Sequence, residues 1–166
     1  MIFKTTKPHI AELAQVPGSE AYRNVKRFEE LENRDNMLIL RWDAQLYFAN
    51  TSYFKDEMER RVLLKGETLQ SIILDMESIT DIDSTGLHTL EDFIDDLKQK
   101  DLKLYLAGVR GPVRDLMVKG RLIDLIGEQN LFLTVHSAVL HHEHPEMSTD
   151  ADKKYVLQSN ITPSAS

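Results

Sequence analysis

"SIILDMESITDIDSTGLHTLEDFIDDLKQKDLKLYLAG" (residues 71–108) decides the fold of this chain. It begins with a continuous apolar run at 71–76, the kind of strand that is buried on both faces of a sheet. A polar bend then leads into a helix whose single apolar face consists of Leu87, Leu90, Ile94 and Leu97. A second apolar run follows at 102–108. This order predicts two parallel, neighbouring strands joined by a right-handed crossover through the helix.

The residues after 108 continue the alternation. Pro112 is well placed as the first residue of a helix, where its missing amide hydrogen does no harm, and Gly120 would end that helix. A short apolar turn at 121–127, a last strand at 131–135 and a last helix at 137–144 follow. Such alternation is typical of α/β domains.

The front of the chain predicts antiparallel pairing instead. "HIAELAQVPG" (9–18) alternates apolar and polar residues and then breaks at Pro-Gly, which is typical of an edge strand. The charged stretch 19–36 has weak periodicity, so we interpret it as a connecting loop. "MLILRW" (37–42) predicts a strand, and "AQLYFAN" (44–50) is expected to pair with it as a hairpin.

A helix is expected between this hairpin and the apolar run at 71–76. Its candidate N-caps are Asn50, Thr51 and Ser52. Its buried stripe would consist of Phe54, Met58 and Val62. Gly66 would end it.

The fold prediction is therefore an α/β domain with a mixed β-sheet of four to six strands and about four to five helices packed on it. Residues 71–76 and 102–107 would be adjacent, parallel and central in that sheet. The domain would span 1–146, including a linker or edge strand at about 7–18. The polar residues 147–166 would form a disordered tail.

Composition excludes several classes of protein. The 166 residues carry a formal net charge of −7, with 27 acidic against 20 basic residues, which argues against a nucleic-acid partner. The absence of cysteine excludes disulfides and thiolate metal sites. No apolar run approaches the ~20 residues that cross a bilayer, and the first residues lack the apolar stretch of a secretory signal.

Ser84 is the first candidate for chemistry. A serine directly before a helical stretch is typical of an N-cap, whose hydroxyl accepts a hydrogen bond from a backbone amide two or three residues on. We interpret Ser84 mainly as this cap, which predicts a loss of about 1 kcal/mol for Ser84→Ala. Nearby carboxylates would oppose a phosphate added there. They are Asp75, Glu77, Asp81 and Asp83.

Catalysis by this helix is not favoured. Ser84, His88 and Asp92 share one face at spacings of four residues. That face lies away from the apolar stripe, so it is expected to be solvated. An exposed serine there has no oxyanion donors and no fixed base.

Two other patterns also have structural explanations. The histidines of "HHEH" (141–144) are expected to be solvated at the negative end of the last helix rather than to bind a metal. Gly108 and Gly111 match no phosphate-binding loop and are read as a strand-to-helix turn. The residues therefore predict no enzyme, no metal site and no cofactor.

Several stretches in combination carry a family resemblance. "LDMESITDIDSTGLHTL" (74–90) resembles the signature of STAS domains, the α/β modules shared by bacterial anti-sigma-factor antagonists and the cytoplasmic tails of sulfate-permease (SulP) anion transporters. Residues 102–127 look like the family's later strand and helix. "ILRWDAQLYFANTSYFKDEM" (39–58) is similar to the transporter tails, and 7–25 to the segment joining their last membrane helix to the domain. The resemblance covers roughly 7–142 and implies a STAS-like fold.

The resemblance also implies a site. In the antagonists, a partner kinase phosphorylates the serine that directly follows the aspartate of the motif. That serine corresponds here to Ser84, after Asp83, and Thr85 and Gly86 complete the motif. These four residues are therefore expected to form a phosphorylation or regulatory site.

Two functions are compatible with the resemblance. The first is a cytoplasmic regulatory domain of a SulP-type transporter of a sulfate-like anion, which supports assembly or activity of the membrane domain. The chain would then be the soluble part of a larger membrane protein, at the cytoplasmic face of the cell membrane. Its partners would be that membrane domain, a cytoplasmic regulatory protein, or a second copy in a dimer formed through the parent protein.

The alternative is a free anti-sigma-factor antagonist, a signalling switch phosphorylated on Ser84. The reading frame upstream of Met1 distinguishes the two. About a dozen membrane-spanning segments there would establish the first function. A native start codon beside a kinase gene would establish the second.

The helix after the motif also carries an acidic face, formed by Glu91, Asp92, Asp95 and Asp96. One explanation is a plain solvated surface. The other is a docking surface for a basic partner, such as a cytoplasmic loop of the parent transporter. In that case we expect Asp92 and Asp95 to carry the contact.

Overall fold

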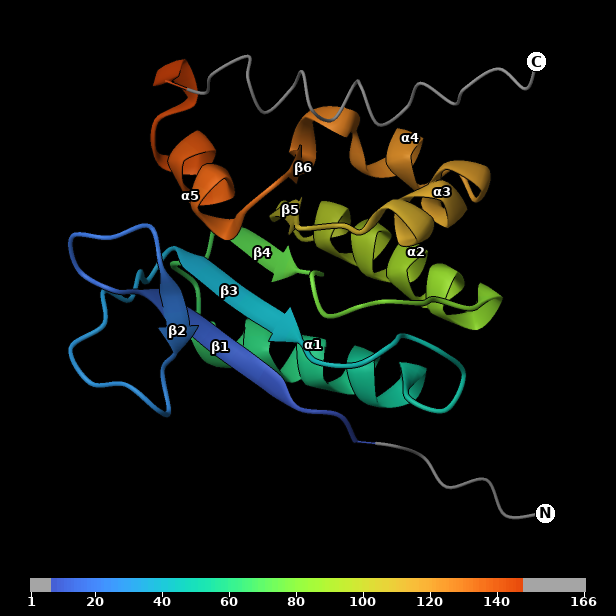
Figure 1. Ribbon diagram of the computed structural model, residues 1–166, viewed down its shortest axis with the longest axis horizontal. Coiled ribbons are helices and arrows are strands. Elements are labelled where there is room, and N and C mark those ends of the chain that lie inside the picture. Colours follow the sequence, from blue (N-terminus) through green and yellow to red (C-terminus); the bar gives the residue numbers. More distant parts are fainter. Residues whose placement is uncertain (1–6, 148–166) are drawn as a thin grey trace.

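The computed structural model describes residues 7–147, which form a six-stranded mixed sheet with helices on both faces (Figure 1). The strands lie in the order β2-β1-β3-β4-β5-β6. The predicted α/β fold with four to six strands is confirmed. Within the described residues, no helix combines the length and the apolar character needed to cross a membrane.

The elements alternate along the chain after residue 37. The strands are β1 (Ile10–Gln15), β2 (Tyr22–Asn24), β3 (Met37–Trp42), β4 (Ser71–Asp75), β5 (Lys103–Ala107) and β6 (Leu131–Phe132). The α-helices are α1 (Thr51–Lys65), α2 (Ser84–Gln99), α3 (Gly111–Lys119), α4 (Leu122–Ile126) and α5 (Val135–Glu143). Two short 3-10 helices are η1 (Glu128–Asn130) and η2 (Pro145–Met147).

The parallel strands β3, β4 and β5 form the centre of the sheet. Leu74 of β4 lies between Leu40 of β3 and Leu106 of β5 in the strand register. Every residue of β4 is buried, because helices cover both of its faces, which accounts for its continuous apolar run. The prediction that 71–76 and 102–107 are adjacent, parallel and central is confirmed.

The sheet separates two apolar cores, because successive side chains of a strand point to opposite faces. On one face the strands contact α1, α2, α3 and α4, in a cluster that includes Leu40, Leu74 and Leu106. On the other face they contact α5, in a cluster that includes Ile39, Ile73 and Tyr105. We refer to this second side as the α5 face.

Three predictions for the N-terminal part of the sheet are wrong. β1 is not an edge strand, because it lies between β2 and β3 and is antiparallel to both. β2 forms that edge, and it lies inside the stretch 19–36 that was expected to be a loop. Residues 44–50 form a loop instead of the second strand of a hairpin, and Leu46 there makes a single bridge to Ile82.

Local hydrogen bonds explain the loop at 44–50. The Asn50 side chain accepts a hydrogen bond from Tyr47 N at 3.1 Å and donates one to the Gln45 carbonyl at 2.8 Å. Trp42 Nε1 donates to the same carbonyl at 3.2 Å. An asparagine that bonds nearby backbone groups stabilises a turn in place of a strand. With its side chain engaged in this way, Asn50 precedes α1 without capping it through that side chain.

The later elements differ in detail. α3 begins at Gly111, one residue before Pro112. Residues 121–127 contain the short helix α4 rather than only a turn. The predicted strand at 131–135 is reduced to β6, because Thr134 caps α5 by accepting a hydrogen bond from Ser137 N at 3.1 Å. The five α-helices within residues 7–147 agree with the predicted four to five.

The predicted tail at 147–166 lies outside the described residues, except for Met147, which ends η2. The division of the chain into a domain at 1–146 and a disordered tail therefore stays a prediction.

Candidate functional site

The motif at residues 83–86 lies where α2 begins. Asp83 is the N-cap, since its backbone is extended (φ −93°, ψ 179°) and its carboxylate accepts a hydrogen bond from Gly86 N at 2.7 Å. The prediction that Ser84 is the cap is wrong. Ser84 is the first helical residue, whereas a cap precedes the helix in an extended conformation.

Asp83 also connects α2 to the loop at 44–50. Its second carboxylate oxygen accepts a hydrogen bond from Phe48 N at 3.0 Å. Its own amide donates to the Leu46 carbonyl at 3.2 Å. One aspartate thus fixes both the start of the helix and the loop beside it.

Ser84 and Thr85 are exposed, and within residues 7–147 neither hydroxyl has a hydrogen-bond partner. Gly86, by contrast, is buried. The four residues of the motif are thus brought together as one site with two accessible hydroxyls, a capping carboxylate and a tightly packed glycine. A modifying enzyme or a partner could reach either hydroxyl without unfolding the chain.

Only part of the acidic surroundings expected for Ser84 is present. Asp75 and Glu77 line a hollow on the α5 face, together with Gly108 and Arg110. α2 covers the opposite face of the sheet. Of the four carboxylates that were expected to surround Ser84, the two on the α5 face therefore do not belong to the motif, and Asp81 and Asp83 remain beside it in the chain.

The predicted partner residues share a groove between α1 and α2. Asp92 and Asp95 are exposed and line this groove of about 390 Å³, to which Phe54 and Phe93 also contribute. His88 Nε2 lies 3.6 Å from a carboxylate oxygen of Asp92, with both side chains more than half exposed. The predicted exposure of this helical face is confirmed.

Of the histidines near the end of α5, His144 is exposed as predicted, whereas His141 and His142 are only partly exposed. The His142 ring nitrogen Nδ1 lies 3.2 Å from the Tyr105 hydroxyl, and burial lowers the pKa of His142, which favours the neutral imidazole. The His141 ring packs against Phe132 and Tyr105, with ring centroids 5.1 Å and 5.6 Å apart. These two side chains therefore hold α5 against the sheet.

A second polar site was missed from the sequence. It is a hollow of about 720 Å³ at the carboxyl ends of β3, β4 and β5, on the α5 face. Arg41 and Asp75 lie on its lining and are direct neighbours in the register of β3 and β4. The available signal was a charged residue near the end of two apolar strands, because the carboxyl ends of parallel strands meet at one edge of a sheet, where ligands commonly bind.

Arg41 is engaged by Asp43, whose carboxylate accepts hydrogen bonds at 2.6 Å and 3.1 Å. The His9 ring nitrogen Nδ1 lies 2.7 Å from Asp43 as well. Partial burial raises the pKa of Asp43, but the hydrogen bonds with Arg41 and His9 outweigh it and hold that pKa below its ordinary value. Burial raises the pKa of Asp75, and the hydrogen bond from Glu77 N only partly offsets this.

Comparison with known proteins agrees with the fold. The STAS domain model matches residues 29–138. Sulfate transporter 1.3 of Arabidopsis thaliana is 33% identical over 147 residues, which cover 84% of this chain and 22% of that protein. High affinity sulfate transporter 2 of Stylosanthes hamata gives the same identity and coverage. This chain thus spans about a fifth of the length of these relatives.

A solved structure shares the fold at lower sequence identity. The murine Slc26a9 anion transporter in its inward-facing state superposes with a TM-score of 0.77 and 23% identity, covering 84% of this chain and 23% of that chain.

Together, the mixed sheet, the helices on both faces and the exposed motif at the start of α2 define a small α/β domain with an accessible site at one helix terminus. The chain belongs to the STAS domain family.

The cap geometry predicts which residue of the motif stabilises the helix. Asp83→Ala should lower the free energy of unfolding by about 1–2 kcal/mol, since it removes the acceptor for Gly86 N. Ser84→Ala and Ser84→Asp should each change it by less than about 0.5 kcal/mol, the usual range for an exposed site. Urea unfolding of the three variants measures this. A loss at Ser84→Ala equal to that at Asp83→Ala would contradict the assignment of the cap.

Proposed function

We propose that this chain is the cytoplasmic STAS domain of a SulP-type transporter of a sulfate-like anion, where it supports assembly or activity of the membrane domain. The observation that carries the proposal is the sequence identity to sulfate transporters along most of this chain. The matched region is only a part of those transporters. The domain would work by binding, without catalysing a reaction and without a cofactor. Its place would be the cytoplasmic face of the cell membrane.

The alternative, a free anti-sigma-factor antagonist, is favoured by one observation. Ser84 is exposed at the first position of a helix, where the backbone amides favour a phosphate. The same exposure suits a regulatory phosphorylation within a transporter. The similarity to sulfate transporters supports the first function. We propose residues 83–86 as its regulatory site.

The groove between α1 and α2 is the surface that we assign to the membrane domain or to a regulatory protein. Asp92 and Asp95 give it a negative rim, and Phe93 gives it apolar area. Lys100 pairs with the neighbouring Asp96 at 2.9 Å. Asp92 and Asp95 are then the acids that α2 contributes to the lining without a lysine or arginine partner among the described residues, and α1 adds Glu59 and Lys55. A basic segment complements this surface.

Charge reversal tests the assignment in the full-length transporter. Asp92→Lys with Asp95→Lys should reduce anion transport several-fold at unchanged surface expression, because two attractions of up to about 1 kcal/mol each become repulsions. Glu29→Lys with Asp35→Lys is the matched control, because both residues are exposed loop acids far along the chain from α2. Radiolabelled sulfate uptake is the measurement. Equal uptake by the two double variants would remove the groove from the proposal.

The same uptake assay also tests residues 83–86 as a regulatory site, through two variants of Ser84. Since Ser84→Asp is expected to fold like the unmodified chain, a change in uptake relative to Ser84→Ala would report the added charge. Identical uptake by both variants would leave residues 83–86 with a structural role alone.

A further inference from the structure

The hollow at the carboxyl edge of the sheet is built by the strand register. Arg41, Asp75 and Ala107 lie side by side on β3, β4 and β5. Ala11 of β1 lies opposite Arg41, so alanines flank the two charged residues on both sides. Small side chains at the ends of this row leave space above it, between the β1–β2 hairpin and the start of α5.

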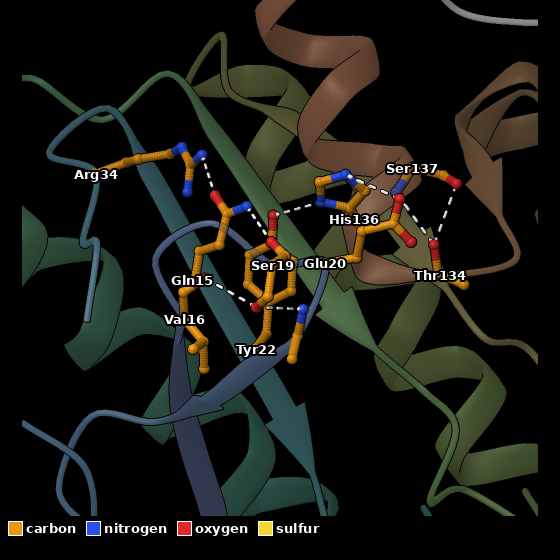
Figure 2. A network of polar contacts seen from close by, with 10 residues as sticks. Gln15, Val16, Ser19, Glu20, Tyr22, Arg34, Thr134, His136 and Ser137 are labelled. Carbon is orange, nitrogen blue, oxygen red and sulfur yellow. Dashed lines mark hydrogen bonds and ion pairs between the residues drawn. The ribbon is translucent and has the colours of Figure 1, made fainter. Parts of the chain in front are cut away.

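The rim of the hollow is held by contacts between the hairpin and α5. Figure 2 shows Tyr22 and Glu20 of the hairpin meeting His136 of α5. The Tyr22 hydroxyl lies 3.2 Å from His136 Nδ1, and a carboxylate oxygen of Glu20 lies 3.9 Å from His136 Nε2. Binding sites for small molecules are usually preformed in this way.

Asp75 is the unusual group in this hollow. Only 8% of the residue is exposed, and one carboxylate oxygen accepts a hydrogen bond from Glu77 N at 3.0 Å. Among the residues that the structure describes, the other oxygen has no hydrogen-bond donor, and no basic side chain lies within 4 Å. Its neighbour Arg41 is bonded to Asp43 instead. Among the described residues this oxygen is not one of the fully buried atoms without a partner, so it is accessible from the hollow to a donor group of a ligand.

Positive groups lie on another part of the same lining. Arg110 Nε donates a hydrogen bond to the Glu77 carbonyl at 2.6 Å, which holds the guanidinium group at the wall. Val135, the first residue of α5, also lines the hollow, so the positive end of that helix faces it. Gly108 forms a tight turn at the wall, with φ at +67°. A Cβ added to it would lie only 3.2 Å from Glu77 Cβ.

The charges of the lining nearly balance. The acidic residues are Glu20, Asp43, Asp75 and Glu77, and the basic ones are Arg23, Arg41 and Arg110. A simple anion would meet four carboxylates, and a simple cation would meet three guanidinium groups. A ligand that carries both charges satisfies both sets of groups.

We propose that this hollow binds a small zwitterion, which presents an ammonium group to Asp75 and a carboxylate to Arg110 and the start of α5. The volume of about 720 Å³ lies within the usual range for small-molecule sites and accommodates a free amino acid or a dipeptide. The site lies on the α5 face, away from the motif of α2. The proposal therefore does not depend on the transporter assignment, and failure of one leaves the other unaffected.

The test uses the 166-residue chain with glycylglycine as the probe, followed by two-dimensional amide NMR. Saturable shifts are expected at Ser78, Gly108 and Val135. Asp75→Asn should weaken binding at least about tenfold, and Asp56→Asn, an exposed acid on α1, should leave it unchanged. Because burial raises the pKa of Asp75, its ionisation destabilises the fold as pH rises through that value, so an uncharged asparagine should keep the chain folded.

Methylammonium and acetate, each with one of the two charges, separate the outcomes. Weak, non-saturating shifts with either ion beside saturation with glycylglycine support the proposal. Saturation by acetate or sulfate at the same residues, unaffected by Asp75→Asn, would identify an anion site and overturn it. Non-saturating shifts with glycylglycine, or equal binding by Asp75→Asn, would overturn it as well.

Discussion

Phe54→Ala should lower the free energy of unfolding by about 4 kcal/mol, within the usual range for a fully buried phenylalanine. Phe54 belongs to α1 and is 0% exposed, and its ring contacts the end of β3 and α2. It meets Trp42 edge to face at 5.1 Å between ring centroids and Phe93 at 5.6 Å. Removal of the ring leaves a cavity beside the rings of Trp42 and Phe93, which can fill it only by tilting. Both edge-to-face contacts are also lost.

Leu63→Ala on the same helix is the matched control, because this leucine is 77% exposed and its loss should change stability by less than about 0.5 kcal/mol. Phe54→Leu should fall between the two variants, since it retains much of the volume. Urea unfolding followed by tryptophan fluorescence is suitable, because Trp42 lies beside the substituted ring. A loss below about 2 kcal/mol for Phe54→Ala would show that the core repacks around the site.

The centre of the fold could be predicted because several sequence signals there agree. The run at 71–76 is apolar except for Ser71 and Asp75, and the helix after it repeats apolar residues at helical spacing up to Leu97. β4 is buried on both faces, and the three consecutive apolar residues at its centre show no alternation with polar residues. A parallel pair joined by one helix then has a single usual handedness. Burial, periodicity and chain connection all lead to the same topology.

The front could not be predicted in the same way, because local patterns there have several meanings. Residues 44–50 alternate like a strand, but Leu46 is buried in the larger apolar cluster and Asn50 stabilises a turn. β2 has only three residues and lies within a charged stretch. Its pairing with β1 is a contact that its own sequence pattern does not indicate. Tertiary contacts determine the conformation of both segments, and no short-range sequence pattern reveals those contacts.

The N-cap of α2 was predicted to within one residue. Asp83 and Ser84 are both good capping residues, so sequence preference alone does not choose between them. The choice comes from the backbone, which stays extended through Asp83 because the loop at 44–50 bonds to it. The hollow on the α5 face was missed for a different reason. Arg41 and Asp75 are 34 positions apart, and only the strand register makes them neighbours.

Gly86→Ala should lower the free energy of unfolding by about 2–3 kcal/mol, although alanine favours a helix by up to about 1 kcal/mol over glycine. A Cβ on Gly86 would lie 2.4 Å from the Leu46 carbonyl oxygen and 2.8 Å from Ile82 Cγ1. The carbonyl belongs to a loop already fixed by Asp83, so relief of the clash requires the first turn of α2 to move.

Gly111→Ala is the control, because a Cβ at the start of α3 meets nothing within 4 Å and its stability should stay the same or rise slightly. Thermal unfolding of both variants measures the difference, with a fall of roughly 5–10 °C expected for Gly86→Ala alone. Equal melting temperatures would mean that α2 can shift freely against the loop. The expected fall would instead show that the glycine of the motif is required for close packing, which holds Ser84 and Thr85 at a fixed position on the surface for any enzyme or partner that reaches them.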